Sequence, residues 1–465
     1  MRKLFLFIFI TSLFACSEMT ETKTVLISGQ IFNPASEYVF FDMGKDSDTA
    51  ILDSTAKFTL TLKLEKPGYV VLSHGREITQ MFLYPGDDVY LTLDTEEFDE
   101  TINYSGIGAL QNNYLASRYL INEKMNKNPR EAFQKEEKEF MELMNKTHQV
   151  LTYHLDTFFF EQDEKYIEFV ALEKNRMGYE KASEMLMYPS YYKYLSGDKE
   201  YIPSEGYYAF LEEVDLNNGE HMDLDEYKSL LQMYVSEIGR KEIKDNPAYE
   251  DYDNPYNMAT LSIIVEKFSD EKVKNFLLKE FVMDMINYSG ITREDTALTI
   301  FYANCSDTAV IRKVEEGIKK WEKIAKGQPA PGFNYPDING EMLALDDLKG
   351  KYVYIDVWAT WCGPCKTEIP YLKALEKEFH GRNIAFISIS VDDSREDWEK
   401  MVRDKELGGI QLFGGAGWKS TITADYNIRG IPRFILIDSE GMIIDATAPR
   451  PSGDIKEILL ALEGI

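Results

Sequence analysis

Two cysteines separated by two residues, Cys362 and Cys365, stand where an apolar run meets a segment of helical periodicity. Residues 352–358 predict a strand, and residues 366–379 predict a helix. The first turn of a helix leaves backbone N–H groups unpaired, and its peptide dipoles place partial positive charge there. Since this environment stabilises a thiolate over a thiol, the pattern predicts a redox-active dithiol. We expect Cys362, at the helix N-terminus, to be the attacking nucleophile and Cys365, one turn deeper, to be the resolving thiol.

Three other uses of a cysteine pair fit the sequence less well. A structural zinc site needs four ligands, usually as two close pairs, but the remaining cysteines, Cys16 and Cys305, are isolated. A structural disulfide remains an alternative, although a bridge between residues so close in sequence constrains almost no chain. A peroxiredoxin would carry proline seven residues and serine or threonine three residues before its reactive cysteine, where this chain has Ile355 and Ala359. We therefore expect no metal centre and no peroxidase chemistry, and we expect Cys305 to be a small buried side chain.

The segment WCGPCK resembles the active site of thioredoxins, and the likeness extends to both sides of it. Asp356, six residues before Cys362, matches the buried acid that relays a proton to and from the deeper cysteine in that family. Pro370 matches the proline that kinks the active-site helix, and residues 429–438 match the segment that carries a cis-proline facing the disulfide. The resemblance covers about the last 140 residues and implies an α/β thioredoxin fold, with one sheet between helices.

The stretch before the cysteines is similar to the lead-in of membrane-tethered thiol–disulfide oxidoreductases of the TlpA/ResA type. In that subgroup a glutamate three residues after the second cysteine lies near the site, and Glu368 occupies this position. The resemblance implies that Cys365 is deprotonated with help from Asp356 and Glu368. Arg433, in the cis-proline segment, departs from the small residues common there and is a candidate for tuning the choice of client.

The residues around the dithiol carry further expectations from the same resemblance. We expect a cis bond between Ile431 and Pro432, since a tertiary amide lowers the cost of that isomer. Its role would be to hold an extended client segment and to keep metal ions off the dithiol, while Trp361 shields the site. Gly363 and Pro364 resemble the dipeptide of reducing thioredoxins. The expected activity is therefore reduction of disulfides in client proteins, fed by a membrane thiol electron carrier and without a cofactor.

The first fifteen residues have the composition of an export signal. Arg2 and Lys3 precede an apolar run at residues 4–15. At about 1.5 Å per residue this run spans ~18 Å, short of the ~30 Å hydrocarbon core, so we expect a signal peptide at 1–15 and not a spanning anchor. The ending LFAC at residues 13–16 resembles the bacterial lipoprotein cleavage box. It implies lipidation of Cys16, a tether at 16–23 and a lipid-anchored place in the cell envelope, facing the periplasm or the outside of the outer membrane. Ordinary secretion is the alternative.

Composition and periodicity outline the rest of this multidomain chain, whose 465 residues should form two or three domains. With a formal net charge of −28 and no basic stripe to follow phosphates, nucleic-acid binding is not expected. Alternating residues at 24–106 predict a small β-sandwich, which resembles the N-terminal domain found before thioredoxin modules in Bacteroidetes lipoproteins. Residues 107–326 contain several stretches of helical spacing, among them 258–285, and predict an all-α region. The thioredoxin-like domain is expected at 327–465, after a linker rich in proline and glycine.

A second hypothesis belongs to another class of protein. The chain could be a client-binding or adaptor lipoprotein of the envelope, in which residues 24–326 carry the function and the thioredoxin module assists. Tyrosine-rich stretches at 188–194 and 248–256 could form a peptide-binding surface, although such clusters more often pack loops onto helices. Replacement of Cys362 separates the two hypotheses, because only the enzyme depends on that thiol.

Overall fold

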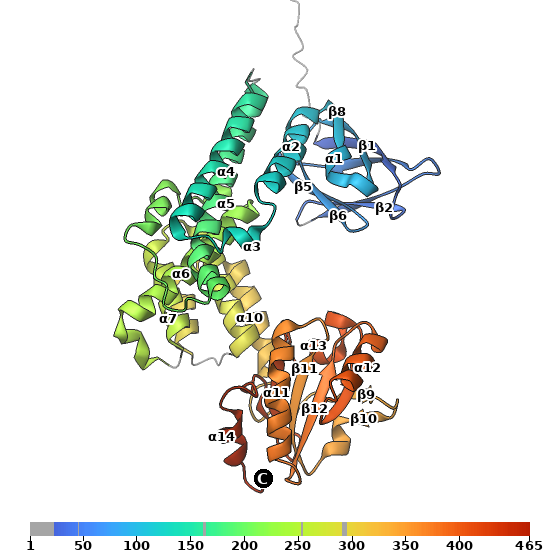
Figure 1. Ribbon diagram of the computed structural model, residues 1–465, viewed down its shortest axis with the longest axis vertical. Coiled ribbons are helices and arrows are strands. Elements are labelled where there is room, and N and C mark those ends of the chain that lie inside the picture. The colour runs from blue at the N-terminus through green and yellow to red at the C-terminus, as the bar shows by residue number, and fades with distance from the viewer. Residues whose placement is uncertain (1–22, 45, 161–163, 253, 291–294) are drawn as a thin grey trace, which may run out of the picture. The chain divides into compact units, whose positions relative to one another are not determined.

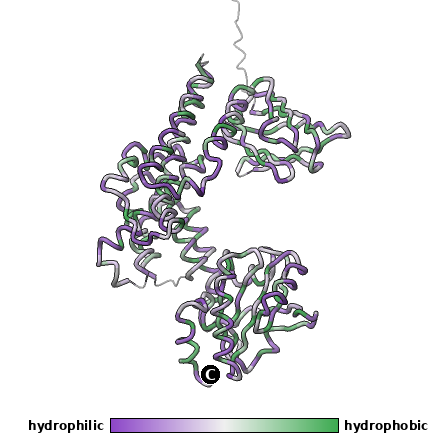
Figure 2. The backbone as a smooth tube through the Cα atoms, in the orientation of Figure 1, coloured by the Kyte–Doolittle hydropathy of each residue, from purple (hydrophilic) through white to green (hydrophobic). Residues whose placement is uncertain are grey.

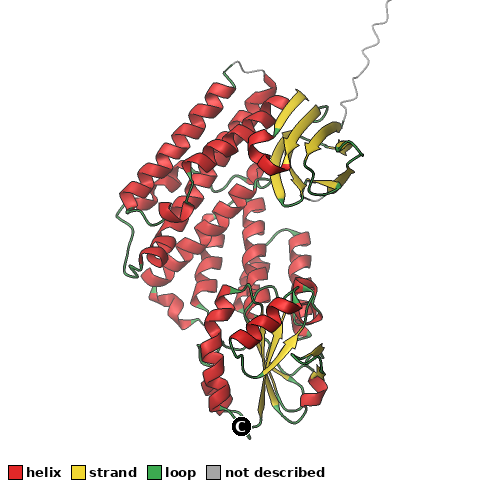
Figure 3. Cartoon of the chain, turned by 45° about the vertical axis from the view of Figure 1, so that its right-hand side comes forward, coloured by secondary structure: helices red, strands yellow, loops and turns green. Residues whose placement is uncertain are grey.

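The computed structural model describes residues 23–465 except 45, 161–163, 253 and 291–294 (Figure 1). The predicted signal peptide, the predicted lipidation site Cys16 and most of the predicted tether lie outside the described residues. The chain divides after Val214 into two compact units, and each unit combines helices with strands (Figure 3). The domain boundaries expected at residues 106 and 326 stay predictions.

The strands described in the first unit form two four-stranded sheets, with the orders β4-β1-β7-β8 and β3-β2-β5-β6. Buried side chains alternate along β1, as the period of a half-buried strand requires. Apolar residues of both sheets, such as Ile27 and Phe41, form one hydrophobic core. The strands are β1 (Thr24–Phe32), β2 (Tyr38–Asp42), β3 (Ser47–Ile51), β4 (Lys57–Lys63), β5 (Gly68–His74), β6 (Glu77–Leu83), β7 (Asp88–Asp94) and β8 (Asn103–Ile107).

Helices complete the first unit and are fastened to the strands by a buried polar cluster. Glu173 of α5 pairs with Arg176 on the same helix at 2.7 Å and with Arg118 of α2 at 3.4 Å, and all three residues are buried. Tyr69 of β5 donates a hydrogen bond to the same carboxylate. Since each buried charge has a partner of opposite sign, the cluster is a structural joint. The helices are α1 (Phe98–Thr101), α2 (Ala109–Met125), α3 (Pro129–Ala132), α4 (Glu137–Phe158) and α5 (Glu164–Ser196).

The second unit begins with a helical region, in which the stretch of helical spacing at 258–285 is divided into two helices. The chain leaves the helix at Phe268 and starts another after Asp270, whose carboxylate accepts the backbone N–H groups of Lys272 and Val273 at 2.9 and 3.1 Å. This side-chain cap satisfies donors that a continuous helix would have bonded internally. The helices are α6 (Asp225–Asp245), α7 (Pro255–Lys267), α8 (Glu271–Asp284), which continues into a π-helical turn (Met285–Ser289), α9 (Thr296–Asn304) and α10 (Thr308–Glu322).

Hydrophilic and hydrophobic positions are interspersed along the helices of both units (Figure 2). Among the residues that the structure describes, no helix combines the length and apolar character needed to cross a bilayer.

The C-terminal part of the second unit is a five-stranded sheet with the order β13-β12-β11-β14-β15 and helices packed around it (Figure 1). Strands β11, β12 and β13 are parallel, whereas β14 and β15 run antiparallel. This is the thioredoxin fold that the resemblance implied, with the additional short edge strand β13. The elements are β11 (Tyr352–Trp358), α11 (Gly363–Glu378), β12 (Ile384–Ser390), α12 (Arg395–Asp404), β13 (Ile410–Phe413), α13 (Thr421–Asp425), β14 (Arg433–Ile437), β15 (Ile443–Asp445) and α14 (Ile455–Leu460), preceded by a hairpin of β9 (Asn334–Pro336) and β10 (Met342–Ala344).

The sheet topology brings three distant segments to one end of β11. The parallel partner β12 ends beside it, with Trp358 opposite Ser390. The antiparallel partner β14 begins there, with Val357 opposite Arg433. The first turn of α11, the end of β12 and the loop before β14 therefore meet at the end of the central strand.

Candidate active site

Cys362 and Cys365 form a disulfide at the junction of β11 and α11, with their Cα atoms 5.3 Å apart. Cys362 is the N-cap of α11, and its Sγ accepts the backbone N–H of Cys365 at 3.1 Å. Gly363 and Pro364 form the first turn, where the missing N–H of proline costs no hydrogen bond. The sulfur of Cys362 thus lies on the unpaired amides of a helix N-terminus, the position at which a thiolate is stabilised.

The loop before β14 faces the disulfide. The peptide bond between Ile431 and Pro432 is cis, and the carbonyl oxygen of Ile431 lies 3.7 Å from Sγ of Cys362. The backbone of Ile431 is therefore placed so that an extended segment bound to it would lie beside the reactive sulfur.

Two exposed indole rings flank the site. Trp361, which directly precedes the disulfide, is 55% exposed, and Trp418 is 50% exposed. Their ring centroids are 6.1 Å apart. The expectation that Trp361 shields the site did not include this second ring, which a short turn at Gly417–Lys419 brings from 57 residues away in the sequence. Exposed aromatic pairs of this kind are common contact groups for apolar side chains of a partner.

Asp356 lies on β11 beneath the disulfide and is buried. Burial, and to a smaller extent the negative charges of Glu368 and Glu376, together raise the pKa of its carboxyl to about 8, although a hydrogen bond from Ser388 acts in the opposite direction. A carboxyl group with a pKa near neutrality can both take and return a proton at physiological pH. Asp356 and Cys365 line the same small cavity, so the acid stands beside the deeper sulfur as the resemblance implied.

Glu368 is buried but engaged elsewhere. Its carboxylate accepts the backbone N–H of Ser452 at 3.0 Å and the hydroxyl of Ser452 at 2.9 Å, and Arg450 lies 3.9 Å away. Glu368 therefore holds the loop before α14 against α11, and it acts on Asp356 through its charge. A direct part in deprotonating Cys365 stays a prediction.

Asp392 is a positioning residue that the sequence reasoning missed. Buried at the end of β12, its carboxylate accepts the backbone N–H of Thr360 at 3.0 Å and the hydroxyl groups of Thr360 and Ser390, both at 2.7 Å. These bonds fix the turn between β11 and the disulfide. An aspartate immediately after an apolar strand predicted next to β11 would have been the available signal.

Arg433 does not face the client side of the disulfide. It is buried, and its guanidinium donates to the backbone carbonyls of Asn287 and Tyr288 at 2.6 and 3.5 Å, at the C-terminal end of the π-helical turn after α8. Desolvation lowers its pKa from the ordinary value. The ring of Tyr288 covers Gly430, where any side chain would collide with it. The cis-proline loop is therefore tied to the helical region.

Replacing Arg433 with methionine is expected to loosen this tie. Two carbonyl acceptors at a helix end would lose a charged donor, which costs about 1–3 kcal/mol. We expect a fall of several degrees in the midpoint of thermal unfolding, followed by tryptophan fluorescence, which reports only on the second unit because all five tryptophans lie there. Arg429→Met is the matched control, because Arg429 is exposed in the same loop. Equal midpoints for the two variants would contradict the structural role of Arg433.

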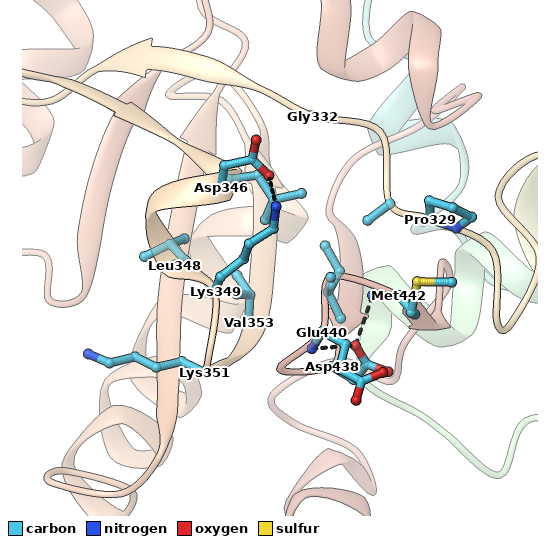
Figure 4. A pocket seen from close by; sticks show the side chains of 14 residues that line it. Pro329, Gly332, Asp346, Leu348, Lys349, Lys351, Val353, Asp438, Glu440 and Met442 are labelled. Carbon is cyan, nitrogen blue, oxygen red and sulfur yellow. Dashed lines mark hydrogen bonds and ion pairs between the residues drawn. The ribbon is translucent and has the colours of Figure 1, made fainter.

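A pocket of about 290 Å³ lies at the opposite end of β11 and takes no part in this site (Figure 4). Among its lining residues, Lys349 pairs with Asp346 at 2.9 Å, and Asp438 accepts the backbone N–H groups of Glu440 and Met442. These charged side chains are thus used in local contacts that stabilise the turns on which they lie. The pocket borders the start of β11, roughly 20 Å along the strand from the cysteines.

Comparison with known proteins places the C-terminal part of the chain among thiol-active proteins. Residues 326–446 match the AhpC/TSA family, over about a quarter of the chain. Thioredoxin-like protein YneN of Bacillus subtilis is 37% identical over 127 residues, 27% of this chain and 74% of that protein. Thiol-disulfide oxidoreductase ResA of Bacillus cereus is 32% identical over 125 residues, 27% of this chain and 70% of that protein. The crystal structure of the thioredoxin domain of a thiol-disulfide oxidoreductase from Bacteroides vulgatus is 32% identical, covers 29% of this chain and 95% of its own, and has a TM-score of 0.27.

Proposed function

Because the chain belongs to the thioredoxin-like thiol–disulfide oxidoreductases, we propose that it reduces disulfides in client proteins of the cell envelope. The observation that carries this proposal is the Cys362–Cys365 disulfide itself. Cys362 caps the N-terminus of α11, and the buried Asp356 lines the same cavity as Cys365. The relatives do not favour the adaptor hypothesis, in which the thiols would be dispensable.

In the proposed reaction the thiolate of Cys362 attacks one sulfur of a client disulfide. A bond forms between Cys362 and that sulfur, and the client's second sulfur leaves as a thiolate and takes up a proton. Cys365 then loses its proton to Asp356 and attacks Cys362. The Cys362–Cys365 bond forms, the bond to the client breaks, and the client has gained two electrons and two protons.

The remaining parts of the proposal concern where the chain works and what restores it. Reduction of the Cys362–Cys365 disulfide requires a thiol donor, and we assign this role to a membrane thiol electron carrier. The signal-like residues 1–15 and the LFAC motif support a lipid anchor at Cys16 in the envelope. Labelling cells with an alkyne fatty acid should tag the wild-type chain and leave a Cys16→Ser variant untagged.

The direction of the reaction is tested by equilibrating the full chain with glutathione buffers and by following insulin reduction. The proposal expects a reduction potential near that of thioredoxin, about −270 mV, and insulin precipitation in the presence of a thiol donor. A potential near −120 mV, which is typical of strong oxidants, would contradict the reductase proposal.

A further inference from the structure

A small cavity of about 20 Å³ lies behind the disulfide, between α11 and the sheet. Cys365, Asp356 and Glu376 line it together with Trp358, Ser388, Gln411 and several apolar side chains. A cavity of about 10–15 Å³ on this measure holds one water molecule when polar partners are present. The space therefore fits a single water next to the deeper cysteine.

Three buried polar atoms on its lining residues are suited to bind that water. Within the part of the chain that the structure describes, Oδ1 of Asp356, Nε1 of Trp358 and Oε1 of Gln411 have no hydrogen-bond partner. Buried polar groups without a partner are rare and each costs about 1–3 kcal/mol. When Asp356 carries its proton on Oδ1, the three atoms comprise two donors and one acceptor, so one water can accept from Asp356 and Trp358, donate to Gln411, and keep its second hydrogen for Glu376.

Glu376 reaches the same cavity from the outer side. It follows Cys365 by eleven residues, about three turns of α11, and so lies on the same face of the helix. The residue is half-buried, and its carboxylate lies so close to Gly408 that any side chain there would collide with it. Burial raises the pKa of Glu376 to about 7, and the positive charge of Lys373 opposes this. Its charge in turn raises the pKa of Asp356.

We propose that this cavity holds a water molecule through which Glu376 passes the proton of Asp356 to and from solvent. The inference rests on the dithiol chemistry proposed above but not on its direction, because opening the disulfide uses the same path in reverse. In this proposal Glu376 contacts neither sulfur. It acts through the water and Asp356, and its half-buried side chain links the buried carboxyl of Asp356 to solvent.

During closing of the disulfide, Cys365 gives its proton to Asp356 and its thiolate attacks Sγ of Cys362 in the mixed disulfide. The Cys362–Cys365 bond forms, the bond from Cys362 to the partner sulfur breaks, and the partner leaves with the electron pair as a thiolate. Asp356 then donates its proton to the water, the water donates one to Glu376, and Glu376 releases it to solvent. Asp356 is thereby returned to the form that can accept the next proton.

The closing step can be measured without any client protein. Reduced full-length chain is mixed with oxidised glutathione, quenched with acid and analysed by mass spectrometry, which separates the Cys362–glutathione adduct from the closed disulfide. In Glu376→Gln we expect closing to slow on the order of 10-fold, so that the adduct accumulates, and we expect its pH profile to lose one ionisation. Glu378→Gln is the matched control, because Glu378 lies on the same helix, outside the cavity, in an exposed pair with Lys456 at 2.8 Å.

Two further variants separate a proton path from a packing defect. Glu376→Asp keeps the carboxyl group and should retain the wild-type number of ionisations. In an Asp356→Asn background, Glu376→Gln should cause no additional slowing, since its effect passes through Asp356. Wild-type closing in Glu376→Gln, or the same 10-fold slowing in the Asp356→Asn background, would overturn the proposal. If the wild-type chain closes its disulfide at the usual rate but does not reduce insulin, the reductase function is contradicted. The variants above then still test the proton path by themselves.

Discussion

Cys362→Ser is expected to abolish disulfide exchange. A serine hydroxyl remains protonated at neutral pH even at a helix N-terminus, so the variant has no thiolate with which to attack a disulfide. Cys365 cannot replace it, because only Cys362 faces the carbonyl of Ile431, at 3.7 Å, where a client segment would lie. We expect insulin reduction by the full chain to fall by on the order of 10³-fold or more, as for loss of a nucleophile in other enzymes.

Two other cysteine variants make this experiment specific. Cys365→Ser retains the nucleophile and should therefore form a mixed disulfide with its substrate that persists, visible as a covalent adduct on a non-reducing gel. Cys305→Ala removes the free thiol found among the described residues. Cys305 is buried at the C-terminal end of α9, burial raises its pKa, and its loss should leave activity unchanged. Retention of activity in Cys362→Ser, or its loss in Cys305→Ala, would refute the assignment of the nucleophile.

Asp356→Asn is expected to stabilise the second unit at alkaline pH while it slows closing of the disulfide. The pKa of Asp356 is about 8 in the folded chain, against about 3.9 for an unfolded aspartate. Between these values the folded state holds a proton that the unfolded state has released. Its contribution to stability is therefore fully present below about pH 4, declines as the pH rises, and is lost above about pH 8. Asparagine stays neutral throughout and removes this decline.

Each pKa unit corresponds to about 1.4 kcal/mol, so Asp356→Asn should be more stable than the wild type by a few kcal/mol at pH 9, and similar to it at pH 4. Urea unfolding monitored by tryptophan fluorescence at the two pH values measures the difference. Asp425→Asn is the control, because Asp425 is an exposed aspartate of the same domain. A wild-type curve that does not weaken between pH 4 and pH 9 would show that Asp356 is not protonated in the folded chain. The slower closing of the Cys362–Cys365 disulfide in Asp356→Asn is measured by mixing the reduced chain with oxidised glutathione and quenching with acid.

The strand, turn and helix around the dithiol could be predicted because their signals are local. Residues 352–358 are apolar or aromatic apart from Asp356, as in a central strand with both faces covered, and the cysteine spacing fits one helical turn. The cis-proline loop was accessible through the family resemblance. The break before α8 is not visible in the apolar spacing, which continues across it, because the break is set by the side-chain cap of Asp270.

Residues that join the site through tertiary contacts could not be found in this way. Asp392 meets Thr360 only because β12 pairs in parallel with β11, and Trp418 meets Trp361 through a turn with no motif of its own. The edge strand β13 has only four residues, too few to show alternation. Glu368 has the family spacing, yet its bonds to Ser452 depend on a loop 84 residues away.

The bond between Arg433 and the end of the π-helical turn affects how truncated forms of this protein should be interpreted. A fragment that starts at residue 327 lacks Asn287 and Tyr288, whose carbonyls accept from that guanidinium and whose ring covers Gly430. In such a fragment a positive charge and a bare glycine would be exposed to water beside Ile431. The surface around the cis-proline loop would therefore be more open and more basic than in the intact chain, so stability and binding measured on the excised domain would not carry over directly to the whole protein.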